Sequence, residues 1–125
     1  MNMAGKKILI IEDDPDSRMG VDIRLRKHGY DTAFAGDAVT ALSVMQREKH
    51  DLVLLDLGLP ADDGFALLDR VKKTAALSAT PVIVLSARDP VPNRELALKA
   101  GAVAYFQKPA DNEELMETIR KILMG

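Results

Sequence analysis

The apolar segment from Leu52 to Leu55 constrains the fold of this chain more than any other feature. The run is too short for a helix, and it lacks the polar–apolar alternation of a strand with one solvated face. Such a run is typical of a strand that is buried on both faces, as in a parallel sheet. It ends at a carboxylate, Asp56, and Pro60 and Gly64 then break the chain before a helical pattern begins. The sequence therefore predicts an acid at the C-terminal edge of a central strand, where open α/β sheets bind their ligands.

Strand-like segments alternate with helical patterns along the whole chain. The predicted strands cover residues 8–11, 30–35, 52–56, 82–86 and 102–106. The predicted helices run from Pro15 to a stop at Gly29, from the cap Asp37, over 65–74, over 93–100 with a stop at Gly101, and from the cap Asp111. Strict alternation predicts parallel strands joined by right-handed crossovers, with helices on both faces of the sheet.

The first predicted helix follows a short acidic segment. Asp14 is interpreted as its N-cap, and Ser17, Val21, Leu25 and His28 recur along it at helical spacing. The two histidines of the chain, His28 and His50, are interpreted as ordinary surface or interface residues rather than metal ligands.

Composition limits the classes of function that remain. With 125 residues the chain is long enough for one domain with a buried core, and we expect a single domain over residues 1–125 with an ordered core of about 6–124. The absence of cysteine excludes disulfides and thiolate metal sites. A net charge of −2 gives no general attraction to nucleic acid or anionic lipid, and no apolar run approaches a membrane span of ~18 residues. We therefore expect a cytoplasmic protein that binds neither nucleic acid nor membranes directly.

Polar residues stand at the C-terminal ends of four predicted strands: Glu12 with Asp13, Asp56, Ser86 and Lys108. These ends share one edge of a parallel sheet, so we expect the side chains to converge. Three carboxylates at one place repel one another unless a divalent cation and a lysine neutralise them. Oxygen ligands favour a hard cation such as Mg²⁺. With a hydroxyl and a lysine, this set suits phosphoryl transfer, in which positioning and charge neutralisation supply most of the catalysis.

These motifs resemble those of the receiver domain of two-component response regulators, and the resemblance covers essentially the whole chain. The matching motifs are Ile10-Ile11-Glu12-Asp13-Asp14, Asp56-Leu57-Gly58-Leu59-Pro60 with Asp63-Gly64, Ser86-Ala87, and Gly101-Ala102 followed by Tyr105-Phe106-Gln107-Lys108-Pro109. The intervals between them also match that family closely. The resemblance implies a flavodoxin-like, doubly wound (βα)5 fold with a five-stranded parallel sheet of order 2-1-3-4-5.

The resemblance also implies a phosphoacceptor and a metal site. Asp56 is expected to take a phosphoryl group from a phosphohistidine on a sensor histidine kinase or a histidine phosphotransfer protein. Asp13, Asp56 and the backbone carbonyl of Gly58 are expected to hold Mg²⁺, with Mn²⁺ as an alternative ion. Glu12 is expected to act through a metal-bound water.

Further residues are expected to bind the phosphoryl group and to change conformation when it is bound. Lys108 and Ser86 would bind phosphoryl oxygens, and Tyr105 would turn inward when Ser86 moves toward the phosphate. Pro109 is expected to follow a cis peptide bond. Such domains catalyse their own phosphorylation and dephosphorylation but are regulatory domains rather than turnover enzymes. The output face would be formed by the fourth helix, the fifth strand and the fifth helix.

The chain departs from many DNA-binding relatives at Val103 and Ala104, where those relatives carry two acids used in a common activated dimer. We therefore expect a monomer or a weak dimer that signals to a separate protein or an adjoining domain. Gly58 and Arg88 occupy the two positions that tune phosphoryl lifetime in the family. The chain ends directly after the last predicted helix, which leaves a stand-alone regulator and a part of a longer protein, such as a hybrid kinase, as the two interpretations.

Three other functions share parts of the pattern. An aspartyl-phosphate hydrolase of the doubly wound class normally shows Asp-x-Asp after the first strand and a capping insertion, whereas Asp56 follows the third predicted strand. A degenerate receiver-fold interaction module would lack one of the acids or the lysine. A flavodoxin would need a hydroxyl-rich phosphate loop where this chain has Glu12-Asp13-Asp14.

Overall fold

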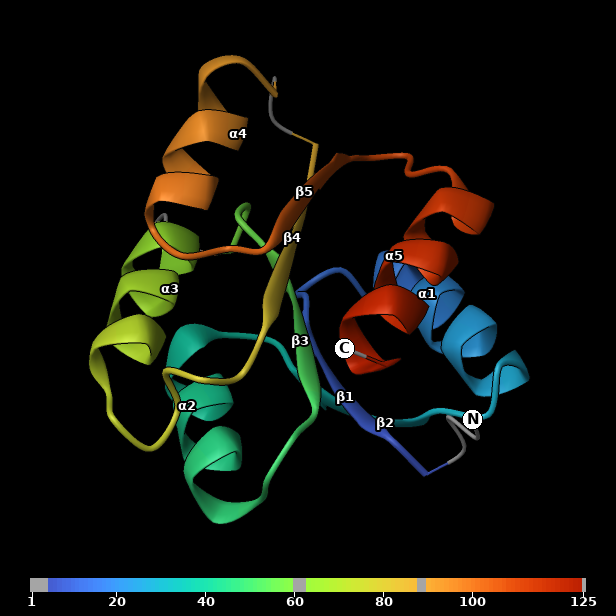
Figure 1. Ribbon diagram of the computed structural model, residues 1–125, viewed down its shortest axis with the longest axis horizontal. Coiled ribbons are helices and arrows are strands. Elements are labelled where there is room, and N and C mark those ends of the chain that lie inside the picture. Colours follow the sequence, from blue (N-terminus) through green and yellow to red (C-terminus); the bar gives the residue numbers. More distant parts are fainter. Residues whose placement is uncertain (1–4, 60–62, 88–89, 125) are drawn as a thin grey trace.

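Five strands alternate with five helices in the computed structural model of the chain, which describes residues 5–59, 63–87 and 90–124 (Figure 1). The elements are β1 (Lys7–Ile11), α1 (Pro15–Lys27), β2 (Asp31–Ala35), α2 (Ala38–Arg47), β3 (Leu52–Asp56), α3 (Asp63–Lys73), β4 (Val82–Ser86), α4 (Pro90–Lys99), β5 (Ala104–Gln107) and α5 (Asn112–Met124). Pro60 and Arg88 lie outside the described residues. None of the described helices has the length and apolar character needed to cross a membrane.

All strand pairs in the sheet are parallel, and the strand order is β2-β1-β3-β4-β5. Helices α1 and α5 cover one face of the sheet, and α2, α3 and α4 cover the other (Figure 1). The predicted doubly wound fold and its strand order are therefore confirmed.

The central strand is buried on both faces, as its apolar run predicts. Each residue from Leu52 to Leu55 is at most 1% exposed. Side chains alternate along a strand, so Val53 and Leu55 pack in the core cluster beside α2 and α3, whereas Leu52 and Leu54 pack in the cluster beside α1 and α5. Because both faces are covered, the strand is removed from water. Its C-terminal residue, Asp56, is only partly buried and is the residue of this strand that can react.

Two strands begin later than predicted because the residue expected to start each strand closes the preceding helix instead. After α1, the amide of Gly29 donates to the Arg26 carbonyl and that of Tyr30 to the Leu25 carbonyl. After α4, Gly101 and Ala102 make the same pair of bonds. This is the Schellman arrangement, in which a left-handed glycine ends the helix and an apolar residue follows it.

Helix α4 begins earlier than predicted, but its first turn is irregular. Val91 has extended backbone angles (φ −110°, ψ 117°) within the helix. Pro92 follows it, and a residue before proline is driven away from the helical region. The regular part of α4 therefore starts close to Asn93, where the sequence predicted the helix to begin.

His50 is buried, so its interpretation as a surface residue is wrong. It stands two positions before Leu52 and continues the alternation that buries this strand. Burial lowers the pKa of its imidazole, and neither ring nitrogen has a hydrogen-bond partner among the described residues. Nε2 lies 3.8 Å from a carboxylate oxygen of Glu48. His28, at the end of α1, is exposed as predicted.

Replacing Gly64 with alanine is expected to destabilise the domain by about 1–3 kcal/mol. A Cβ at Gly64 would lie 2.6 Å from Leu57 Cα and 2.9 Å from the Leu57 carbonyl oxygen. Both are backbone atoms just after β3, so the clash is relieved only by moving the end of the central strand. Urea unfolding followed by circular dichroism measures the change in the free energy of unfolding.

Gly20→Ala is the matched control for this substitution. Gly20 lies inside α1, where a Cβ meets no described atom within 4 Å. Alanine should therefore stabilise the domain by about 0.5–1 kcal/mol through its better helix propensity. Stabilisation by Gly64→Ala would contradict the close approach of Gly64 to the backbone of Leu57.

Candidate functional site

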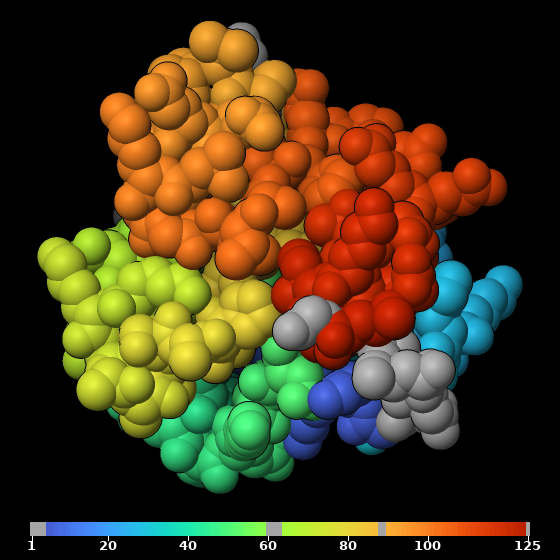
Figure 2. Space-filling view, in the orientation of Figure 1, coloured from blue at the N-terminus to red at the C-terminus, as the bar shows by residue number. Residues whose placement is uncertain are grey.

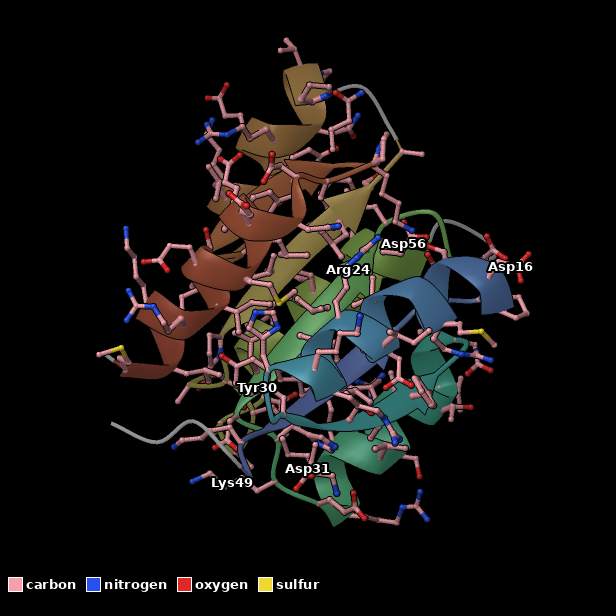
Figure 3. All side chains as sticks on the ribbon, turned by 90° about the vertical axis from the view of Figure 1, so that its right-hand side faces the viewer. Asp16, Arg24, Tyr30, Asp31, Lys49 and Asp56 are labelled. Atoms are coloured by element: carbon pink, nitrogen blue, oxygen red, sulfur yellow. The ribbon has the colours of Figure 1, made fainter. Side chains whose placement is uncertain are left out.

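Three of the predicted site residues converge because strand side chains alternate between the two faces of the sheet. The residues two positions before Glu12, Asp56 and Lys108 all pack on the side of the sheet covered by α1 and α5. The three polar side chains continue this alternation past the last apolar residue of each strand. They therefore reach the same face at the same edge of the sheet. Figure 3 shows Asp56 at the end of the molecule where α1 begins, opposite to the end that carries Tyr30.

The Lys108 ammonium connects the acids of the site. It donates to Oε1 of Glu12, to Oγ of Ser17 at 3.0 Å and to Oδ2 of Asp56 at 3.4 Å. The backbone amide of Lys108 donates to the carbonyl of Ser86 at 2.8 Å, which ties this residue to the end of β4. An ammonium has three donors, and each of them has an acceptor here.

The three acids predicted to bind metal also lie together. Glu12, Asp13 and Asp56 each offer a carboxylate oxygen, and these oxygens lie within 4.8 Å of one another. Asp13 is exposed, whereas Glu12 is buried and its Oε2 has no hydrogen-bond partner among the described residues. A buried acceptor without a donor is unfavourable, and a hydrated cation would supply one. The residues present therefore fit a hard cation such as Mg²⁺, which keeps several of its waters.

The carboxyl groups of Glu12 and Asp56 shift in opposite directions. Burial and the hydrogen bond with Glu12 raise the pKa of Asp56 to about 6, against an opposing hydrogen bond from the Gly58 amide. Burial acts to raise the pKa of Glu12 as well, but hydrogen bonds with its three polar neighbours lower it to about 2. The two carboxyl groups therefore titrate as a pair, and the direction of the shifts favours protonation of Asp56 over Glu12 as the pH falls.

Gly58 contacts Asp56 through its amide. The N–H of Gly58 donates to Oδ1 of Asp56 at 2.9 Å. A Cβ at this position would lie 3.4 Å from the same oxygen, so a larger side chain would stand directly beside the carboxylate. The expected metal contact of the Gly58 carbonyl stays a prediction.

Ser86 and Tyr105 lie on the other face of the sheet. Ser86 is fully buried at the end of β4 and follows Val84 by two positions. Val84 pairs in register with Tyr105 of β5, and both pack in the core cluster beside α2 and α3. The hydroxyl and the half-buried tyrosine are therefore close neighbours on one face, as coupling between them requires. Their roles in switching stay predictions.

Ser17 is a site residue that the sequence predictions missed. It shares a face of α1 with Val21 and Leu25, which are buried, and was grouped with them by spacing alone. Its hydroxyl instead lies within hydrogen-bond distance of Lys108 Nζ. The sequence contained one indication of this role. Ser17 places a hydroxyl at the start of an otherwise apolar, inward-facing stripe, four positions after Asp13.

Two local predictions around the site are confirmed. Asp14 is the N-cap of α1, and its side chain accepts a hydrogen bond from the amide of Asp16 at 3.2 Å. The peptide bond between Lys108 and Pro109 is cis. Asp14 therefore serves the helix, which leaves Glu12 and Asp13 as the acids of this loop that join the site.

Comparison with known proteins gives a consistent result. Residues 8–120 match the family model of the response regulator receiver domain. Protein PilH of Pseudomonas aeruginosa is 33% identical over 119 residues, which cover 95% of this chain and 98% of PilH. The transcriptional activator protein IrlR of Burkholderia pseudomallei is 38% identical over 117 residues, which cover 94% of this chain and 50% of IrlR. The chain thus spans about half the length of the first relatives it matches.

A solved structure resembles the chain over nearly its full length. The receiver domain of the sensor histidine kinase PA1611 from Pseudomonas aeruginosa aligns with a TM-score of 0.88 and 29% identity, covering 98% of this chain and 100% of that domain. That structure has a magnesium ion coordinated in its active-site cleft.

A doubly wound parallel sheet with three acids and a lysine at its C-terminal edge defines a class of regulatory signalling domains. The chain belongs to the response regulator receiver domain family of two-component signalling. The family expected from the sequence is therefore confirmed.

Replacing Asp56 with asparagine is expected to stabilise the metal-free domain at neutral pH. Because the folded protein raises the pKa of Asp56 from 3.8 to about 6, the folded state binds this proton more tightly than the unfolded chain. The associated stability is complete below pH 3.8 and is lost as the pH rises through about 6. Asparagine does not ionise, so the variant should exceed the wild type by up to about 2 kcal/mol at pH 7 and by little at pH 4.

Urea unfolding in EDTA at the two pH values measures this difference. Asp31→Asn removes an exposed carboxylate from the opposite end of the sheet and should change stability by less than about 0.5 kcal/mol. Excess Mg²⁺ should narrow or reverse the advantage of Asp56→Asn, because a cation bound to the folded wild type stabilises it. A variant that is less stable than the wild type at pH 7 in EDTA would contradict the raised pKa.

Proposed function

We propose that Asp56 is the phosphoacceptor of this receiver domain and takes its phosphoryl group from a phosphohistidine on a sensor histidine kinase or a histidine phosphotransfer protein. The observation that carries the proposal is the setting of this one carboxylate. It ends the central strand, its Oδ1 accepts from the Gly58 amide at 2.9 Å, and its Oδ2 lies 3.4 Å from the Lys108 ammonium. No other acid of the site combines these contacts among the described residues.

The transfer step needs an ionised acceptor and a neutralised phosphoryl group. An oxygen of Asp56 forms the new P–O bond while the P–N bond to the donor imidazole breaks, and the leaving imidazole nitrogen takes a proton from solvent. The Gly58 amide holds the carboxylate in one orientation, and the Lys108 ammonium stabilises the negative phosphoryl oxygens. Because the chain supplies these groups itself, we propose that it catalyses its own phosphorylation and dephosphorylation as a regulatory domain.

We further propose a Mg²⁺ site formed by Asp13 and Asp56, with the carbonyl of Gly58 as an additional ligand and Glu12 acting through a metal-bound water. Mn²⁺ is the alternative ion. When bound, the cation neutralises the carboxylates and the charge of the transferring group. The proposal is supported by the clustered carboxylate oxygens, by the buried Oε2 of Glu12 without a donor, and by the magnesium ion in the related PA1611 domain.

The arrangement favours this function over its alternatives. A degenerate interaction module has no need to keep three clustered acids, Glu12, Asp13 and Asp56, beside the Lys108 ammonium. A hydrolase of the doubly wound class would place its nucleophile after β1, whereas Asp56 ends β3. A flavodoxin would bind its phosphate after β1, where this chain has buried and exposed acids. The cytoplasmic location and the absence of direct nucleic-acid binding stay predictions, and we treat residues 1–125 as one receiver domain.

Acetyl phosphate with Mg²⁺ is expected to add one phosphate to the wild-type protein, detected by intact mass. The adduct should be labile to base and hydroxylamine, because it is an acyl phosphate. Asp56→Asn should gain no stable phosphate, and EDTA or Asp13→Ala should abolish labelling of the wild-type acceptor.

Asp31→Asn is the matched control and should be labelled like the wild type, since it changes an exposed acid away from the site. Normal, stable labelling of Asp56→Asn would overturn the assignment of the acceptor. Labelling that is unaffected by EDTA would overturn the metal site.

We propose that the face formed by α4, β5 and α5 is the output face, which changes when the domain is phosphorylated. Figure 2 shows α4 in orange and α5 in red next to each other on one side of the molecule. Ser86 and Tyr105 are placed on the α4 side of the sheet, and the apolar side chains of Leu96 and Val103 are 50% and 49% exposed there. We propose that this face binds a separate protein or an adjoining domain, and that the switch acts by moving Ser86 and Tyr105.

The domain is expected to stay monomeric, or to dimerise only weakly, when activated with beryllium fluoride and Mg²⁺. Val103 and Ala104 carry no charge, so they cannot form the acidic pairing used by many DNA-binding relatives. Sedimentation velocity with and without beryllium fluoride measures the change. A tight dimer that forms only on activation and is disrupted by Val103→Glu would contradict this expectation.

A further inference from the structure

Lys108 depends on its contacts to stay in one position. A lysine side chain has about 2 kcal/mol of rotamer entropy, so an ammonium is held at a fixed place only by the groups that accept from it. The Lys108 ammonium is held by Glu12, Asp56 and Ser17, from three different elements of the chain. Two of these acceptors are carboxylates, and the third is a neutral hydroxyl.

The two carboxylate contacts change with the state of the site. Glu12 and Asp56 belong to the acid cluster that fits a divalent cation, and a cation there competes with the ammonium for the same oxygens. Phosphorylation would also convert an oxygen of Asp56 into the bridging oxygen of an acyl phosphate. Ser17 is outside the acid cluster, and its hydroxyl oxygen accepts from Nζ at 3.0 Å. This hydroxyl is neutral, so a cation bound by the acids does not compete for it as it does for the carboxylate oxygens.

Ser17 occupies a position that suits this role. It stands in the first turn of α1 and is half-buried, and α1 starts directly after the loop that carries the acids. The hydroxyl also helps to lower the pKa of the nearby Glu12 carboxyl. Ser17 and Lys108 line a cavity of about 350 Å³ between α1 and the residues after β5, so the ammonium has room to leave its position when a contact is lost.

We propose that Ser17 is a positioning residue for phosphoryl transfer, whose hydroxyl holds the Lys108 ammonium beside Asp56 when the carboxylates are engaged by a cation. This inference rests on the proposed roles of Asp56 and Lys108. Ser17 touches neither the phosphoryl donor nor the reacting atoms, and it acts only through Lys108.

The test compares Ser17→Ala, Ser17→Thr and Ser43→Ala with the wild type. Threonine keeps the hydroxyl at this position. Ser43 is an exposed serine on α2 and controls for the serine-to-alanine change in a helix. Circular dichroism and thermal unfolding verify that each variant is folded.

The first measurement observes Lys108 directly in the unphosphorylated protein. NMR of ¹⁵N-lysine-labelled protein follows exchange of the Lys108 ammonium protons with water at fixed pH, with the signal assigned by its loss in Lys108→Gln. In Mg²⁺ we expect exchange to be several-fold faster in Ser17→Ala than in the wild type, and to be close to wild type in Ser17→Thr and Ser43→Ala.

The second measurement is the rate of phosphorylation by acetyl phosphate at saturating Mg²⁺. Loss of one neutral hydrogen bond that positions Lys108 should slow the reaction about two- to tenfold in Ser17→Ala. The acetyl phosphate concentration at half-saturation should be unchanged, because Ser17 does not touch the donor. Ser17→Thr should recover the rate.

Ammonium exchange and phosphorylation at wild-type values in Ser17→Ala would overturn the proposal, and so would equal defects in the alanine and threonine variants. If the wild type itself is not phosphorylated, the proposed function fails. The exchange measurement then still decides whether Ser17 holds Lys108, because it requires no phosphorylation.

Discussion

The site depends on an imbalance of charge at one edge of the sheet. Glu12, Asp13 and Asp56 bring three carboxylates together, and Lys108 is the cation that contacts two of them. Burial makes the imbalance unfavourable, since neither Glu12 nor Asp56 is well solvated. Below about pH 6 the protein relieves it by taking up a proton, because the pKa of Asp56 is raised to about 6. A bound cation relieves it in another way and leaves Asp56 ionised, which is the form that a nucleophile needs.

The residues of the proposed phosphoacceptor site and the proposed switch residues lie on opposite faces of the parallel sheet. Glu12, Asp56 and Lys108 continue the strand faces that pack against α1 and α5, whereas Ser86 and Tyr105 belong to the face beside α2, α3 and α4. The Lys108 amide donates a hydrogen bond to the Ser86 carbonyl and so joins the two sets at the sheet edge. A change at the acceptor is thus able to reach the opposite face through the ends of neighbouring strands, without any rearrangement of the buried core.

Sequence patterns were least informative where one residue serves two elements. Tyr30 and Ala102 were predicted as the first residues of their strands, but both close a Schellman motif, so the strands start later. His50 was interpreted as a surface or interface residue, although it is buried and continues the alternation of β3. Ser17 was grouped with an apolar stripe by its spacing, and only its contact with Lys108 shows a different role. In each case the deciding contact involves a partner that local periodicity does not identify.

The sequence by itself determined the fold class and the residues at each strand end, because these follow from hydrophobic period and turn chemistry along the chain. The strand order was expected only from the resemblance to the receiver domain family. The tertiary structure decided which of those residues meet and in what state. Lys108 contacts Glu12 across 96 positions and Ser17 across 91 positions of the chain. The opposite pKa shifts of Glu12 and Asp56 depend on those contacts and on burial. Both are set by distances between side chains from different elements, and no pattern along the chain contains them.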